Sequence, residues 1–246
     1  MNAITCVSRL DCASTHLSRQ LILTRNDHPF GSEIRTSRDH TFSPYASAAG
    51  QSTGTYKEAL MQTRLNAFAL KDLKSPGKAT WLNRSFVCIE QSALIDKALT
   101  KELLECSEIL RTLGQTLVIT LNDLPLPAIN FTNKKKILHN LYQLKDHGIE
   151  IAHDGFNINY ESIEIFTTLN LFDYCRISLS TLDLSLKLTG NPDLFNRLYE
   201  RMTMQTHNTK VAFIADRVDH AASHVLARAL PFDYFQGSYY SPAENL

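Results

Sequence analysis

The feature that most constrains the fold is a regular alternation between short apolar runs and amphipathic segments over most of the chain. The runs are rich in β-branched and aromatic residues, as in LVITL at residues 117–121 and YCRI at residues 174–177. The segments between them carry apolar residues at helical spacing, as at residues 93–113. Strands that alternate with helices across short loops predict βα units and a largely parallel sheet. The expected strands are residues 20–24, 78–83, 117–121, 149–152, 174–177, 211–215 and 234–235, and the expected helices are residues 56–73, 93–113, 134–147, 162–170, 193–207 and 221–230.

The alternation does not by itself separate an open doubly wound sheet from a closed barrel. The sequence contains neither GxGxxG nor GxxxxGK[ST], which removes the commonest nucleotide-binding interpretation of an open sheet. Residues 1–18 are polar and are interpreted as a tail or lead-in. Residues 36–55 are rich in Ser, Thr, Gly and Ala and are interpreted as a long loop. We expect residues 19–246 to form a single domain.

The composition is that of an ordinary globular protein, and it argues against several classes. Lys+Arg and Asp+Glu each number 25 among 246 residues, so no bulk charge favours nucleic acid or a membrane surface. No apolar run reaches the length of about 20 residues that spans a bilayer, and residues 1–16 lack the apolar core of a secretory signal. The five cysteines are odd in number and scattered, which argues against a disulfide framework or a zinc site. These observations predict a cytoplasmic protein.

Several segments near the expected strand ends occur in a fixed order. The most specific is ADRVDHAASHVLARALPFDYFQGSYYSP at residues 215–242. The others are RQLILTRNDHPFGSEIRTS at residues 19–37, TWLNRSF at residues 80–86, IAHDGFNINYESI at residues 151–163 and FDYCRIS at residues 172–178. Together they resemble the motifs of the EAL family of bacterial cyclic di-GMP phosphodiesterases.

The resemblance implies an α/β fold, a TIM-like (β/α)8 barrel of EAL type with one reversed strand, whose motifs converge on the carboxyl face of the barrel. An active family member holds two Mg²⁺ or Mn²⁺ ions there with carboxylates and an asparagine. The ion pair activates water for attack on a phosphodiester, which requires hard anionic oxygen ligands.

Eight positions correspond to residues that the family uses in its pocket. Glu33 corresponds to the glutamate of EAL, and Arg176 stands where the family has a lysine. The family's later glutamate pair is represented by two shorter aspartates. The eight candidates for a vestigial or nucleotide-binding pocket are Gln20, Glu33, Asn83, Asp154, Arg176, Asp216, Asp219 and Gln236.

Other positions depart from the family pattern and imply that the metal pair has been lost. Thr120 replaces a ligating glutamate, and Gly155 replaces an aspartate. A neutral hydroxyl does not supply the charge that offsets the dehydration of Mg²⁺. Arg35 stands where EAL has leucine, Ser178 replaces an aspartate, and the arginine of EALxR falls on Ser37. We therefore expect no catalytic residues, no bound metal and no cofactor.

Three hypotheses follow from this comparison. The first is a non-enzymatic regulatory protein that acts through protein contact in bacterial signalling of the motility or biofilm type. The second is a receptor that binds cyclic di-GMP without hydrolysis, and the third is a residual phosphodiesterase. The protein partner carries no motif that names it, and a homodimer is a further hypothesis. A catalytic His153 is not expected, because adjacent strand residues point to opposite faces and His153 would point away from Asp154.

Overall fold

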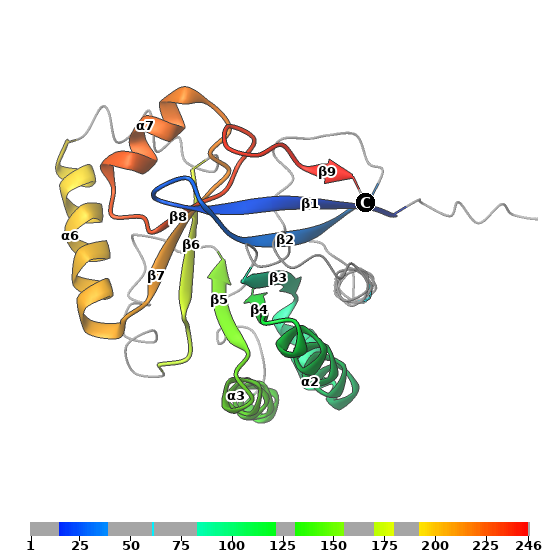
Figure 1. Ribbon diagram of the computed structural model, residues 1–246. Helices are drawn as coiled ribbons and strands as arrows, with labels where there is room; N and C mark the ends of the chain where they lie inside the picture. Colours follow the sequence, from blue (N-terminus) through cyan, green and yellow to red (C-terminus); the bar gives the residue numbers. More distant parts are fainter. Residues whose placement is uncertain are drawn as a thin grey trace, which may run out of the picture.

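The computed structural model describes residues 15–38, 61, 83–121, 131–154, 170–179 and 192–245. Within these ranges eight strands close into a barrel, and a ninth lies outside it (Figure 1). Apart from residues 61 and 170, the expected helices at residues 56–73 and 162–170 lie outside the described residues, as does most of the expected loop at residues 36–55. The strands are β1 (Thr15–Thr24), β2 (Pro29–Arg38), β3 (Arg84–Ile89), β4 (Thr116–Leu121), β5 (Glu150–Asp154), β6 (Tyr174–Ser178), β7 (Ala212–Asp216), β8 (Tyr234–Phe235) and β9 (Glu244–Asn245).

One strand of the barrel runs against the others. β1 is antiparallel to both of its barrel neighbours, β2 and β8, whereas each pair from β2–β3 to β7–β8 is parallel. The outer strand β9 also pairs with β1. The (β/α)8 barrel with one reversed strand is therefore confirmed. The reversed strand begins at Thr15, within the segment expected to be a tail.

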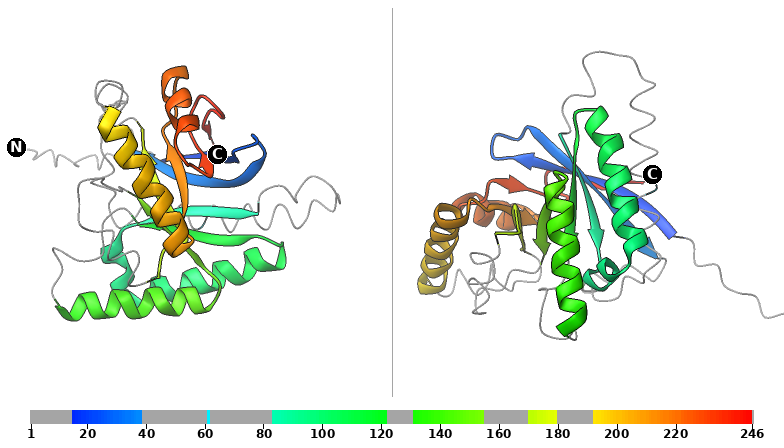
Figure 2. Two further views of the ribbon diagram at one scale, coloured as in Figure 1. Left: turned by 90° about the vertical axis from the view of Figure 1, so that its left-hand side faces the viewer. Right: turned by 90° about the horizontal axis from the view of Figure 1, so that it is seen from below.

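The helices lie on the outside of the barrel (Figure 2). They are α2 (Lys97–Thr112), α3 (Phe131–Asp146), α6 (Pro192–Thr209) and α7 (Ala221–Ala229), preceded by a short 3-10 helix η1 (Gln91–Ile95). The helix expected at residues 93–113 is confirmed as α2, but it starts later than expected, because Asp96 separates α2 from η1. The Asp96 side chain accepts a hydrogen bond from the Ala98 N–H and caps the amino end of α2. None of the helices in the described ranges is long and apolar enough to cross a membrane.

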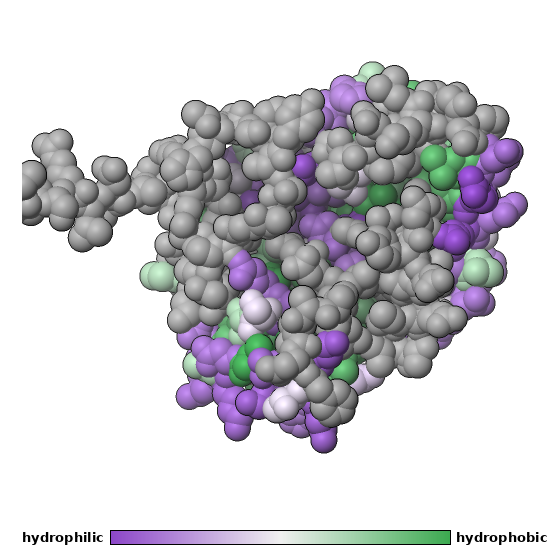
Figure 3. Space-filling model, turned by 180° about the vertical axis from the view of Figure 1, so that it is seen from behind, coloured by the Kyte–Doolittle hydropathy of each residue, from purple (hydrophilic) through white to green (hydrophobic). Residues whose placement is uncertain are grey.

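Apolar residues form two cores, because alternate residues of each strand face opposite sides. The inner core fills the barrel and includes Ile22, Phe86, Val118, Ala152 and Ile214. The outer core lies between the strands and the helices and takes up the intervening strand positions, such as Val87 and Ile119 on β3 and β4. On the face of the molecule in Figure 3, hydrophilic and hydrophobic residues are interspersed.

The amino end of the barrel is closed by a polar cluster. Arg84, the first residue of β3, donates two hydrogen bonds to Glu150 at 2.7 and 3.0 Å, and the Tyr174 hydroxyl donates to the same carboxylate at 2.6 Å. The Arg84 guanidinium lies 4.7 Å from the centroid of the Phe30 ring, which stacks on Tyr234. Because these polar groups form hydrogen bonds with one another, we interpret this end of the barrel as a stabilising element of the fold.

Two arginines fasten the tip of the β1–β2 hairpin to the end of α7. Arg25 donates to the carbonyls of Arg228, Leu230 and Phe232 at 2.7, 3.2 and 3.0 Å, which satisfies acceptors at and beyond the last turn of the helix. Arg228 in turn donates to the Arg25 carbonyl and to Asp27. The first hairpin of the barrel is thus attached to its last helix.

Candidate functional site at the carboxyl end of the barrel

Four of the eight candidate residues meet at the carboxyl end of the barrel. Glu33 lies on β2, Arg176 on β6 and Asp216 at the last position of β7, and Gln236 directly follows β8. Each occupies an inward position of its strand, so the strand alternation brings side chains distant in sequence into one cluster. We call Glu33, Arg35, Arg176, Asp216 and Gln236 the mouth network.

Arg176 lies at the centre of the mouth network. Its guanidinium donates to both carboxylate oxygens of Glu33, from Nη1 to Oε1 at 2.5 Å and from Nη2 to Oε2 at 3.1 Å. Its Nη2 also donates to Gln236 Oε1 at 2.8 Å, and Gln236 Nε2 donates to Glu33 Oε2 at 2.9 Å. The three residues are 1%, 2% and 0% exposed. A bidentate arginine–carboxylate pair is therefore buried where the resemblance places the metal ions.

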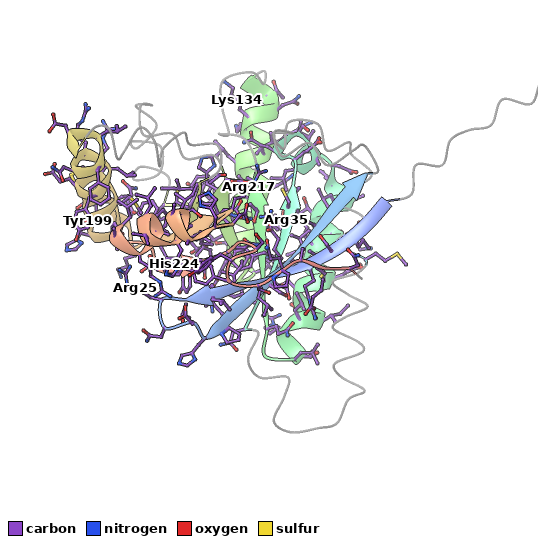
Figure 4. The ribbon with its side chains drawn as sticks, turned by 90° about the horizontal axis from the view of Figure 1, so that it is seen from above. Arg25, Arg35, Lys134, Tyr199, Arg217 and His224 are labelled. Carbon is purple, nitrogen blue, oxygen red and sulfur yellow. The ribbon has the colours of Figure 1, made fainter. Side chains whose placement is uncertain are left out.

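A second guanidinium covers this pair from the solvent side. Arg35 lies two residues after Glu33 on β2, donates from Nε to Glu33 Oε2 at 2.6 Å, and donates from Nη2 to Asp216 Oδ1 at 2.9 Å. Arg176 Nη2 is 3.2 Å from the same Asp216 oxygen. The Arg35 side chain remains 33% exposed, and Figure 4 shows it on β2 as the barrel is seen from above. Both arginines thus contact both carboxylates.

The electrostatics of the mouth network follow from this pairing. Burial alone would raise the pKa of Glu33, but the guanidiniums of Arg176 and Arg35 more than offset it and hold that pKa well below its usual range. Asp216 shows the same balance, and the pKa of its carboxyl is also lowered by Arg35 and Arg176. Asp154 differs, because burial raises its pKa and the charges of Asp216 and Glu33 add to the increase. Glu33 and Asp216 are therefore ionised and paired, whereas the surroundings of Asp154 disfavour the charged form of its carboxyl.

The candidate Asn83 does not reach the mouth network. Of the strand expected at residues 78–83, residues 78–82 lie outside the described ranges, and Asn83 directly precedes β3, which begins at Arg84. Asn83 is exposed just before the amino end of β3. Cys88 occupies the inward position near the carboxyl end of this strand. Burial raises the pKa of its thiol to about 12, with further contributions from the charges of Glu33 and Asp154. The segment RSFVCI gives no alternating signal for this register, because apolar residues occupy both its inward and its outward positions.

Asp154, the last residue of β5, lies opposite Arg176 in the β5–β6 register, and the other positions singled out in the sequence lie outside the mouth network. Gln20, opposite Glu33 in the β1–β2 pairing, donates from Nε2 to the Ser241 carbonyl at 3.0 Å. Asp219 is exposed and accepts hydrogen bonds from the backbone and the hydroxyl of Ser238 at 3.0 and 2.9 Å. Thr120 is 0% exposed on β4, and its hydroxyl has no hydrogen-bond partner among the described residues. Gly155 lies outside the described residues.

A comparison with protein families agrees with this geometry. The model of the EAL domain matches residues 10–243, which is nearly the whole chain. The chain belongs to the EAL domain family. A sequence search of curated proteins found no match.

Solved EAL structures share the fold at low sequence identity. The EAL domain of Mycobacterium smegmatis DcpA has a TM-score of 0.66 and 12% identity, over 94% of this chain and 93% of that one. The phosphodiesterase PaMucR, in complex with c-di-GMP, has a TM-score of 0.67 and 16% identity, over 94% and 92% of the two chains. The EAL enzyme Bd1971, with cAMP and cyclic di-GMP bound, has a TM-score of 0.68 and 14% identity. The chain covers 62% of the length of Bd1971.

The mouth network of this EAL domain does not fit a pair of divalent metal ions. Its oxygen donors include the carboxylates of Glu33 and Asp216, but Glu33 already accepts charged hydrogen bonds from both guanidiniums, and Asp216 accepts one from Arg35 and forms an ion pair with Arg176. With Asp154 ionised, three negative charges would face the two positive charges of Arg35 and Arg176. To bind these carboxylates, Mg²⁺ or Mn²⁺ would have to displace the guanidiniums, which stay charged and belong to the protein itself. Over the described ranges, no group of three or more His, Cys, Asp and Glu side chains is arranged to hold a metal ion.

Proposed function

We propose that this EAL domain is a non-enzymatic regulatory protein that acts by protein contact in bacterial signalling of the motility or biofilm type. The observation that carries the proposal is the mouth network, in which Arg35 and Arg176 neutralise Glu33 and Asp216. The family relationship supports descent from proteins that bind or hydrolyse cyclic di-GMP. A cytoplasmic location is part of the same proposal.

The chemistry of the mouth network argues against hydrolysis. Two-metal hydrolysis of a phosphodiester needs carboxylates that are free to bind cations and a water made nucleophilic by them. Here Glu33 Oε2 accepts from Arg35, Arg176 and Gln236, and Glu33 Oε1 accepts from Arg176. On β4, the hydroxyl of Thr120 stands in place of a charged ligand. The chain therefore retains acidic residues of the family but uses them as partners of arginine.

The outer helices support the protein-contact part of the proposal. Tyr199 on α6, labelled in Figure 4, is 45% exposed, and Met204 on the same helix is 54% exposed. Val225 on α7 is 67% exposed, and Tyr239 after β8 is 47% exposed. Tyrosine and methionine are enriched at protein interfaces, so these helices present residues suited to a partner.

Two measurements on the full chain test the proposal. Hydrolysis of cyclic di-GMP is followed in Mg²⁺ and in Mn²⁺, and we expect no turnover above the rate without protein. Calorimetric titration of cyclic di-GMP, with and without Mg²⁺, tests the second hypothesis, since binding without turnover would assign a receptor.

The decisive control is Glu33→Ala. Turnover by the natural chain that Glu33→Ala abolishes would overturn the proposal, because it would show that Glu33 still serves catalysis. Glu244→Ala is the matched variant, since it removes an exposed carboxylate on the outer strand β9.

A further inference from the structure

Both guanidiniums of the mouth network stand at positions where the family pattern has a different residue. Arg35 replaces the leucine of EAL, and Arg176 replaces a lysine. Both contact Glu33 and Asp216, the two carboxylates of the network. Both departures thus place a planar guanidinium with several N–H donors next to the same two carboxylates, those of Glu33 and Asp216.

We propose that Arg35 and Arg176 are built-in cations that take the place of divalent metal ions at the carboxyl end of the barrel, and that they, rather than the missing carboxylates at positions 120 and 155, exclude metal. This inference rests on the proposed loss of hydrolysis. It goes further by naming the residues whose guanidiniums occupy the carboxylates of Glu33 and Asp216.

The first argument concerns the donors that remain. Glu33, Asp216 and Asp154 supply carboxylate oxygens, and the amide oxygen of Gln236 lies within the same network. Hard oxygen donors of this kind bind Mg²⁺ and Mn²⁺. As they stand, the acidic side chains in the described ranges form no group of three that could hold a metal ion, and guanidinium N–H groups occupy the carboxylates of Glu33 and Asp216.

The second argument is that the two arginine side chains keep their charge. An arginine side chain does not lose its proton in proteins, so raising the pH does not release the carboxylates. Arg176 is 1% exposed and held on three sides by Glu33, Asp216 and Gln236, which leaves it no path into solvent. A divalent ion entering the network would meet two fixed positive charges at close range, where repulsion is strong.

The third argument concerns the missing ligand at Thr120. A glutamate placed there would add one negative charge to the wall of a site that already holds two guanidiniums. The carboxylates of Glu33 and Asp216 would still be occupied by the guanidiniums, so the new carboxylate would lack free partners with which to bind an ion. Restoring the carboxylate alone should therefore leave metal affinity unchanged.

The test compares the two routes to metal binding in the full chain without nucleotide. One variant is Arg35→Leu combined with Arg176→Lys, and the other is Thr120→Glu. Mn²⁺ binding is measured by electron paramagnetic resonance of free Mn²⁺ and by the rise in melting temperature with Mn²⁺ concentration, since a ligand that binds only the folded state stabilises it.

We expect no Mn²⁺ stabilisation of the natural chain or of Thr120→Glu. For Arg35→Leu with Arg176→Lys we expect a saturable rise in melting temperature and an Mn²⁺ affinity at least about tenfold higher. If the double variant does not fold, the single change Arg35→Leu serves instead, because this side chain is one-third exposed and its removal leaves the buried Arg176–Glu33 pair intact.

Two results would overturn the inference. One is Mn²⁺ stabilisation of the natural chain, and the other is a gain of affinity in Thr120→Glu that the arginine variants lack. Neither result requires turnover, so this inference fails separately from the proposed function, which fails on hydrolysis by the natural chain.

Discussion

Removal of the Arg176 guanidinium should be one of the most destabilising single changes in this protein. Arg176→Met keeps much of the side-chain volume, but among the described residues it leaves Glu33 paired with Arg35 and Gln236, and Asp216 paired with Arg35. Breaking a buried ion pair by removing one partner costs about 3–5 kcal/mol, because the other charge stays buried. Since Arg35 remains, we expect a loss near the lower end, about 3 kcal/mol. This is a large share of the 5–15 kcal/mol typical of a domain.

The assay is urea unfolding at pH 7, followed by far-ultraviolet circular dichroism. Arg19→Met is the matched control, because it breaks the exposed Arg19–Glu244 pair, for which a loss of about 0–1 kcal/mol is expected. A loss in Arg176→Met that is no larger than in this control would refute the reasoning.

The same variant makes a prediction about pH. The depressed pKa of Glu33 means that its ion pairs stabilise the fold fully above the ordinary carboxyl pKa of about 4.3 and lose this effect as the pH falls toward the folded value. Arg176→Met removes part of that contribution. The difference in stability between the natural chain and the variant should therefore shrink as the pH falls below about 4. A difference that grows with acidification would contradict the assignment.

Three further predictions concern other parts of the barrel. Tyr174→Phe removes the hydroxyl that donates to Glu150 at the amino end, and we expect a loss of about 1.5–3 kcal/mol in urea unfolding, as for hydrogen bonds to charged groups. Asp154→Asn should raise the melting temperature at pH 7 and have no effect below the ordinary aspartate pKa. The reason is that a carboxyl whose pKa is raised in the folded state lowers the stability of the fold as the pH rises. Equal effects of the substitution at pH 3 and pH 7 would count against this. Gly237→Ala should lower the melting temperature sharply, because Gly237 has a φ of 152° and an added Cβ would lie 2.2 Å from the Val218 carbonyl oxygen. An unchanged melting temperature would show that the backbone adjusts.

The parallel strands were predictable because they are local signals, whereas closure of the sheet into a barrel was expected only from the family resemblance. Strand β4 (Thr116–Leu121) is a continuous apolar, β-branched run that is buried almost throughout, and it was expected within one residue. The helix boundary at Asp96 was missed for a different reason. The apolar spacing continues through η1 and α2, and the interruption depends on the side chain of a single N-cap residue.

The candidate site was predictable only where a motif fixed the register. Glu33, Arg176, Asp216 and Gln236 were expected in one place and lie together. Asn83 was misplaced because a resemblance over seven residues does not locate the start of a strand, and Cys88 was overlooked because it matches no motif. The pairing of Arg35 with Asp216 joins residues 181 positions apart, so no local pattern contains it.

The attachment of the first hairpin to the last helix has a consequence for folding during synthesis. Arg25 and Arg228 are 203 residues apart, and Leu23 on β1 pairs with Phe235 on β8. Until the last strand leaves the ribosome, β1 lacks a neighbour on one side, and the unpaired edge is open to other chains. Contacts of such long range also form slowly, because the chain must first close a large loop. The barrel therefore passes through its most aggregation-prone stage just before completion, and truncation before α7 should yield insoluble protein.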